Sequence, residues 1–220
     1  MKTRDKILEA SLHLFNDHGE RNITTNHIAA HLNISPGNLY YHFKNKSQII
    51  YDLYLNYEKL VDKYLTLPEG RPLEINDKLV YLSAAFQGLW DYRFLHRDLQ
   101  HLLQSDSELQ KRYNIFFKRC LDQVTKIYFG LREADVIKAS DEDIRALALN
   151  TWIIVTSWFG FLHTNLLSDT QKESRELLNA GIHQIFSLER PYLTDAYVEP
   201  VSKLVQKFGS SLEELSALPA

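Results

Sequence analysis

The chain has 220 residues, of which 45% are hydrophobic and 24% are charged, and its formal net charge is −3. This composition is typical of a globular protein with a sizeable core, and it excludes a disordered or collagen-like chain. A single cysteine, Cys120, excludes an intramolecular disulfide, and the first six residues lack the apolar run of a signal peptide. We therefore expect a cytoplasmic protein that folds without disulfides.

A first helix is expected from about residue 3 to residue 18, ending at Gly19, because glycine tolerates the left-handed backbone of a helix end. A helix-turn-helix is predicted directly after it. Thr24 or Thr25 can cap one short helix, and Ser35 followed by Pro36 is the start signal of another. Residues 33–36 turn the chain between the two helices. The three helices share apolar stripes that predict one small core.

The last of these helices carries side chains suited to a DNA groove. They are flat or forked polar groups on short stems, and two lysines follow at once. The predicted DNA-contacting residues are Thr25, Ser35, Pro36, Gly37, Asn38, Tyr40, Tyr41, His42, Lys44 and Lys46. A helix-turn-helix used for packing alone is the alternative. The histidines at 27 and 31 share a helical face but have no third ligand nearby, so they predict no metal site.

The charge distribution agrees with a DNA-binding segment at the N-terminus. Residues 1–47 contain six Lys and Arg against four Asp and Glu, whereas the rest contains 19 against 24. The two segments therefore carry formal charges of +2 and −5. A small basic domain followed by a larger acidic one is predicted.

The run from Ser35 to Lys46, preceded by Ile28 and Ala29 and by an apolar stripe in residues 7–15, resembles the DNA-binding domain of TetR-family transcriptional regulators. The resemblance covers roughly the first fifty residues. It implies a homodimer that binds double-stranded operator DNA, and a larger helical domain that binds a small effector and controls repression. The same resemblance places residues 25, 35, 37, 40, 41, 42 and 46 on DNA-contact positions of the family. Pro36 stands where the family usually has lysine or threonine.

The fold class predicted is all-α, with a helix-turn-helix domain at residues 1–47, a helical effector-binding and dimerisation domain at 48–209 and a loose tail at 210–220. A helix over residues 46–64 connects the two domains, because apolar residues continue at helical spacing up to a break near Pro68. Further helices are expected at about 74–90, 93–104, 106–130, 141–167, 171–188 and 197–208. The charged and aromatic junction at 91–99 is expected to cap or pair with neighbouring helices, and effector binding is the alternative.

Residues 146–168 contain no Asp, Glu, Lys or Arg, which raises the question of a membrane span. Polar residues interrupt the run, and Ser140 with Asp143 forms a capping box before it, so a soluble helix is favoured. A helix that is apolar nearly all round needs neighbours on every side, and a second subunit supplies one. The predicted dimer residues are Trp158, Leu162, Leu178, Gly181, Ile182 and Ile185.

The larger domain is rich in aromatic residues, with scattered polar groups among them. Each aromatic residue taken singly is more often core, but together they are compatible with a mainly apolar pocket. The predicted ligand-binding residues are Trp90, His101, Phe117, Trp152, Thr156 and Phe159. No phosphate loop, nucleophile motif or cofactor motif is present. A DNA-binding regulator released by an apolar ligand is therefore predicted, and a motif-poor helical enzyme or an interaction scaffold is the alternative.

Overall fold

The computed structural model describes residues 2–165 and 175–208. Within these ranges the chain is helical and forms no β-strand, apart from one isolated bridge between Ile137 and Leu193. The helices are α1 Thr3–His18, α2 Thr25–His31, α3 Pro36–His42, α4 Lys46–Tyr64, α5 Ile75–Asp91, α6 Arg93–Arg97, α7 Leu99–Ser105, α8 Ser107–Glu133, α9 Asp141–Asn165, α10 Arg175–Glu189 and α11 Asp195–Val205. The predicted all-α class is confirmed.

The helix-turn-helix forms where the capping residues predicted it. Thr24 caps α2, and its hydroxyl oxygen accepts the His27 backbone N–H at 3.3 Å. Ser35 caps α3 in the same way through the Asn38 N–H at 3.2 Å, with proline at the first helical position. Asn33 turns the chain between the helices with a φ of 53°. Local sequence signals therefore fix both helix starts.

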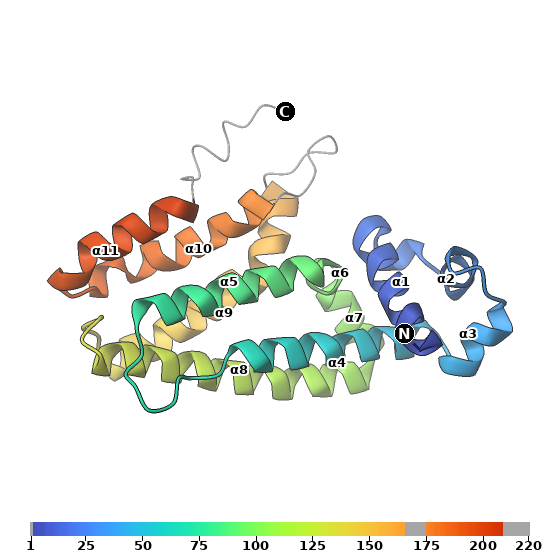
Figure 1. Cartoon of the computed structure of the whole chain (residues 1–220), viewed down its shortest axis with the longest axis horizontal. Helices are drawn as coiled ribbons and strands as arrows, with labels where there is room; N and C mark the ends of the chain where they lie inside the picture. Colours follow the sequence, from blue (N-terminus) through green and yellow to red (C-terminus); the bar gives the residue numbers. More distant parts are fainter. Residues whose placement is uncertain (1, 166–174, 209–220) are drawn as a thin grey trace.

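The eleven described helices form a small group, α1 to α3, and a larger group that carries α5 to α11, and α4 joins the two (Figure 1). Helix α4 runs beside α8, where the buried Glu58 carboxylate binds two guanidinium groups. Its Oε2 atom lies 2.7 Å from Nε of Arg112, and Arg119 donates to both Glu58 and Asp62. Residues on two helices far apart in sequence are thereby held in one register.

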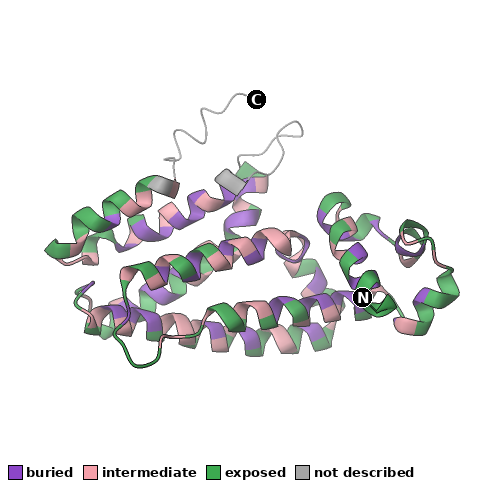
Figure 2. Cartoon of the chain, viewed as in Figure 1, coloured by how far each residue is buried: buried purple, intermediate pink, exposed green. Residues whose placement is uncertain are grey.

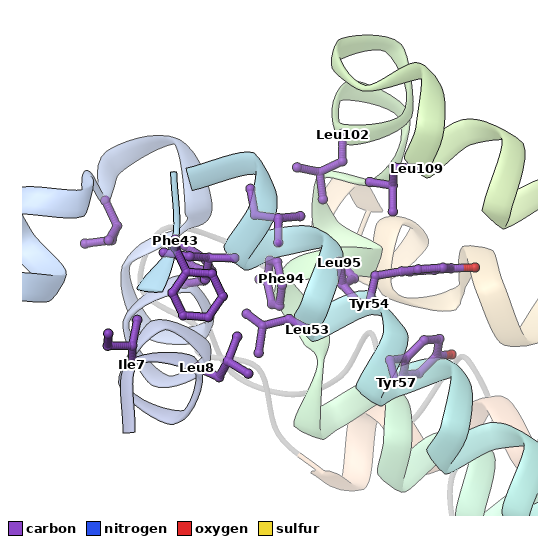
Figure 3. Packing of buried hydrophobic residues seen from close by; sticks show 14 of the residues in the cluster. Ile7, Leu8, Phe43, Leu53, Tyr54, Tyr57, Phe94, Leu95, Leu102 and Leu109 are labelled. Carbon is purple, nitrogen blue, oxygen red and sulfur yellow. The ribbon is translucent and has the colours of Figure 1, made fainter. Parts of the chain in front are cut away.

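The hydrophobic core does not stop at residue 47. One cluster of buried side chains runs from α1 and α3 through α4 to α6, α7 and α8, as Figure 3 shows for Phe43, Leu53 and Phe94. The predicted division into 1–47 and 48–209 stays a prediction, and this division crosses a shared core. The tail expected at 210–220 lies outside the described residues.

The junction at residues 91–99 packs against α1. The Asn16 amide donates to the Asp91 carbonyl at 2.8 Å and accepts the Phe94 backbone N–H at 3.1 Å. Arg93 pairs with Asp17 at 2.7 Å on the same side of the junction. The sequence indicated pairing with neighbouring helices, and the structure shows that the neighbour is the first helix of the DNA-binding segment.

The single helix expected at 93–104 is two helices. Asp98 interrupts it, with φ −114° and ψ 17°, and its carboxylate lies 3.3 Å from the guanidinium of Arg21. This break lets α6 pack on α1 while α7 follows α8. Two other predicted helices were expected to cover residues 141–167 and 171–188. The end expected at 167 and the start expected at 171 lie outside the described residues.

Helix α9 is the one helix in the described ranges that is long and apolar enough to cross a membrane by length and composition. It packs against α8, α6 and α10 in the fold. Its capping box is formed as predicted, because Ser140 and Asp143 exchange hydrogen bonds of 3.1 and 3.2 Å between side chain and backbone.

Candidate functional site

Helix α3 presents most of its surface to solvent. Only Leu39 of this helix is fully buried, and it belongs to the core cluster that also contains residues of α1, α2 and α4. Figure 2 shows the exposed positions along the helix. Of the ten predicted DNA-contacting residues, the exposed ones are Ser35, Pro36, Gly37, Asn38, Tyr40, Tyr41 and Lys44, whereas Thr25, His42 and Lys46 are half-buried. The structure thus brings the ten residues to one end of the molecule, and their role as DNA contacts stays a prediction.

Two contacts hold the tyrosines of α3 in place. The Tyr40 hydroxyl lies 3.0 Å from the Thr25 hydroxyl, which ties the two helices of the motif together across their outer surface. Tyr41 is 85% exposed, and its ring packs edge-on against His42 with centroids 5.1 Å apart. Tyr41 is therefore the large side chain of this helix that projects furthest and is free to meet a base edge or a phosphate.

The ammonium group of Lys46, which was predicted to contact DNA, is occupied by groups of the same protomer. This group donates to the carbonyl oxygens of Glu20 and Ile23, each at 3.0 Å, and lies 2.6 Å from the Glu20 carboxylate. An ammonium group has three N–H donors, and these contacts use all of them. Lys46 therefore fastens α4 to the turn before α2. The exposed Lys44 is the lysine of the pair that stays available for phosphate.

Changing the two lysines separates these roles. Lys46→Met should lower the free energy of unfolding by about 1.5–3 kcal/mol, because it leaves the nearly buried Glu20 carboxylate without its cation. Lys44→Ala should leave stability unchanged and lower the salt dependence of DNA binding by about one unit per subunit. Chemical denaturation and DNA titrations at several salt concentrations measure the two effects. If Lys46→Met is as stable as the unmodified protein, Lys46 does not hold α4 to the turn before α2.

A cavity of about 70 Å³ lies in the larger domain, several times the space that one water molecule needs. Helices α4, α5, α8 and α9 contribute its walls. The lining residues are Tyr57, Val61, Leu65, Lys78, Tyr81, Leu82, Ala85, Phe116, Cys120, Val124, Ile127, Tyr128, Thr151, Trp152, Val155 and Thr156. The wall is mainly apolar, as the sequence predicted for a ligand site. Burial in this wall raises the pKa of the Cys120 thiol to about 12, so the thiol stays protonated at neutral pH.

Two of the six residues predicted to bind a ligand, Trp152 and Thr156, line this cavity. The other four do not belong to its described lining. Trp90 packs beneath Arg93, His101 is exposed on α7, Phe117 packs against Trp152, and Phe159 is buried in another cluster. The aromatic content predicted a pocket in the domain that holds this cavity, but the direction of each ring depends on how the helices pack.

The cavity also has a polar corner that the sequence analysis missed. Lys78, Tyr128 and Thr151 line it, and Lys78 pairs with Glu189 of α10 behind them. The Lys78 ammonium lies 4.4 Å from the centre of the Tyr128 ring. Burial lowers the pKa of Lys78, and the neighbouring Glu189 acts against this shift. The sequence signal for this corner was Lys78, a lysine on an otherwise apolar face of α5.

The predicted dimer residues are buried inside the protomer instead. Trp158, Leu162, Leu178, Gly181, Ile182 and Ile185 all belong to buried positions where α9 and α10 pack on each other and on α5. The Trp158 indole donates to the Leu177 carbonyl at 3.0 Å. A Cβ atom on Gly181 would lie 2.5 Å from the Phe86 ring. The apolar stripe of α10 packs inside its own domain, so these six residues present little surface to a partner, and their role in a dimer stays a prediction.

Family models match both parts of the chain. Residues 7–53 match bacterial regulatory proteins of the tetR family, and residues 56–201 match the bacterial transcriptional repressor domain of TetR. The chain belongs to the TetR family of transcriptional regulators. Its relatives are regulators and not enzymes, so the enzyme alternative is not supported.

Several known proteins resemble this TetR-family member. A TetR-family regulator of Marinobacter aquaeolei VT8 is 54% identical, with a TM-score of 0.87, over 96% of this chain and 100% of that one. A probable acrEF/envCD operon repressor of Escherichia coli K12 is 33% identical over 30% of this chain, and the match spans about a third, 31%, of that repressor. An HTH-type regulator of Staphylococcus aureus USA300 is 35% identical over 51% of this chain and 73% of that one.

Proposed function

We propose that this protein is a cytoplasmic repressor that binds operator DNA as a homodimer and leaves it when a small, mainly apolar ligand occupies the cavity. The supporting observation is that α4 belongs to both regions. It begins four positions after the last residue of α3, and its residues Tyr57 and Val61, with Leu65 directly after the helix, border the cavity. A ligand that displaces these side chains tilts α4, and the recognition helix moves with it. The relatives named above include a probable operon repressor of Escherichia coli K12.

An open pocket beside the cavity offers a route for the ligand. It is lined by residues of α4, α8 and the loop after α4, including Asp62, Arg119 and Gln123. Leu65 and Cys120 line both the pocket and the cavity. Rotation of these two small or flexible side chains would open the wall between them.

The exposed face of α9 is the proposed dimer surface. It carries no charge from residue 146 onward and consists of Ala146, Leu149, Asn150, Ile153, Ser157, Gly160 and Thr164. Leu149 and Ile153 are 43% and 48% exposed, and neither belongs to a core cluster. A Cβ atom on Gly160 would meet nothing, so a partner helix can approach closely. A stripe that is apolar, uncharged and several turns long is typical of an interface between subunits.

Ile153→Arg should convert the dimer to a monomer, because it places an unpaired charge in the centre of this face. Loss of the dimer removes simultaneous binding to two half-sites, and operator affinity should fall by about a hundredfold or more. Sedimentation and operator titrations measure both quantities. The matched control is Val80→Arg on α5, where the side chain is 61% exposed. An Ile153→Arg protein that sediments as a dimer would rule out the α9 face.

Selection of binding sites from a random DNA library tests the DNA-binding part, and a palindromic site is expected. The ligand part is tested by linkage. A ligand that lowers operator affinity tenfold must bind the DNA-free state more tightly by about 1.4 kcal/mol. Operator DNA must then weaken ligand binding by the same factor. If the ligand binds equally tightly with and without saturating operator, ligand binding in this cavity does not control DNA binding.

A further inference from the structure

The polar corner of the cavity is built from four helices. Lys78 comes from α5, Tyr128 from α8, Thr151 from α9 and Glu189 from α10, and all four residues are at most 5% exposed. The Tyr128 hydroxyl donates to the Glu189 carboxylate. The same oxygen lies 2.6 Å from the Thr151 hydroxyl and 3.4 Å from the Lys78 ammonium. The rest of the cavity wall is nearly all apolar, so a polar group of a ligand would be held here.

The hydrogen-bond directions determine what this corner can still bind. Tyr128 gives its only proton to Glu189, so Thr151 must donate to Tyr128. The lone pairs of the Thr151 oxygen then remain as acceptors. Among the described residues the Lys78 ammonium has two hydrogen-bonding partners, Glu189 and Tyr128, which leaves a third N–H as a donor. One acceptor and one donor therefore flank the same tyrosine oxygen at the edge of the cavity.

Charge decides between a neutral ligand and an ionised one. Lys78 and Glu189 together carry no net charge, whichever of them holds the shared proton. An anionic ligand would add an uncompensated charge to an apolar cavity, which is costly. A neutral group that both donates and accepts a hydrogen bond matches the corner, and a hydroxyl is the smallest such group.

We propose that the ligand of this cavity is a neutral molecule with an apolar body and one hydroxyl group, an alcohol or a phenol. Its O–H group donates to the Thr151 oxygen, and its oxygen accepts from the Lys78 ammonium. This inference rests on the proposed ligand control and specifies its chemistry. Thr151 and Lys78 are then the residues that determine specificity. At about 70 Å³ the cavity is about half the volume of a cavity of about 150 Å³ that binds benzene, so a ligand body of one aromatic ring fits only when side chains of the wall move.

Phenol, toluene and benzoate form a matched set of probes, because they present a hydroxyl, a methyl and a carboxylate on the same ring. Partition into a purely apolar site favours toluene, since phenol loses hydrogen bonds to water. The proposal expects the opposite order. Phenol should bind the full-length protein on the order of tenfold more tightly than toluene, and benzoate should bind more weakly than phenol by at least a similar factor. The NMR signal of the Trp152 indole N–H, which reports on the cavity wall, measures each affinity in isotope-labelled protein.

A pair of variants on α9 locates the hydroxyl site. Thr151→Val keeps the shape of the side chain and removes the acceptor, so toluene should then bind at least as tightly as phenol. Thr156→Val is the control, because Thr156 lines the same cavity but donates its hydroxyl to the Trp152 carbonyl at 2.8 Å. Its preference for phenol should equal that of the unmodified protein. Thermal unfolding shows whether each variant is folded.

The outcomes are distinct. If toluene binds the unmodified protein more tightly than phenol, the cavity is a ligand site but hydroxyl recognition is wrong. Tightest binding of benzoate would instead show an anion site. A preference for phenol that survives Thr151→Val would also overturn the proposal. If none of the three probes shifts the indole signal, both this inference and the proposed ligand control fail, while operator binding by the unliganded protein is judged separately.

Discussion

Replacing Phe94 by alanine is expected to lower the free energy of unfolding by about 3–5 kcal/mol. Phe94 is fully buried where α6 meets α1, with its ring centroid 5.2 Å from that of Phe15. Removing the ring leaves a cavity in the core shared by the DNA-binding helices and the larger domain. Chemical denaturation measures the loss, and separate unfolding of the two regions would appear as a second transition.

The control for Phe94→Ala is Ile115→Ala on α8, where the apolar side chain is 57% exposed. This control should change stability by less than about 0.5 kcal/mol. A loss below about 1 kcal/mol for Phe94→Ala would mean that α6 does not pack on α1 in solution.

Acid should destabilise the protein through His96. This histidine lies on α6, and within the described part of the chain neither of its ring nitrogens has a hydrogen-bond partner. Its ring packs edge-on against Tyr57 with centroids 5.2 Å apart. Burial lowers the pKa of His96 from 6.5 to about 4. The folded state therefore holds the imidazole neutral at a pH where the unfolded chain binds a proton.

Proton linkage determines whether acid raises or lowers the free energy of unfolding. Because the unfolded state binds more protons between pH 6.5 and about 4, the stability that depends on neutral His96 is complete above 6.5 and falls as the pH drops toward 4. One pKa unit corresponds to about 1.4 kcal/mol, so the loss over this window is about 3 kcal/mol. Denaturation at a series of pH values should show this loss for the unmodified protein but not for His96→Leu.

A second histidine variant controls for the general effect of acid. His101 is exposed on the neighbouring α7, so His101→Gln should retain the full pH dependence of the unmodified protein. An identical pH profile for the unmodified protein and His96→Leu would show that the buried imidazole does not stay neutral. Because His96 contacts Tyr57, which lines the cavity, the same comparison also reports on the packing between α6 and α4.

The sequence predicted features that depend on neighbours along the chain. Ser35 and Pro36 define the start of α3 through hydrogen bonds within one turn, and Gly19 ends α1 with a φ of 81°. Such signals need no tertiary contact. The same is true of the exposed polar residues of α3, because a short helix with one buried position must expose the others.

Roles that depend on distant residues were predicted poorly. Lys46 seemed free for phosphate, but its partners Glu20 and Ile23 lie more than twenty positions away. Lys78 and Glu189 gave no sign of pairing, because α5 and α10 meet only in the folded domain. The α10 stripe that suggested a dimer surface is covered by Phe86 and other residues of the same protomer.

The sequence by itself therefore determined the helical class and the helix-turn-helix, since capping and periodicity act over a few residues. The family was indicated separately, by the resemblance of the run from Ser35 to Lys46 to a known motif. The tertiary structure alone decided which face of α9 stays exposed, which side chains line the cavity, and that α6 rests on α1. The physical reason is that a periodic apolar stripe indicates how much of a helix is buried. It does not indicate whether the stripe packs against the core of the same protomer, a ligand or another subunit.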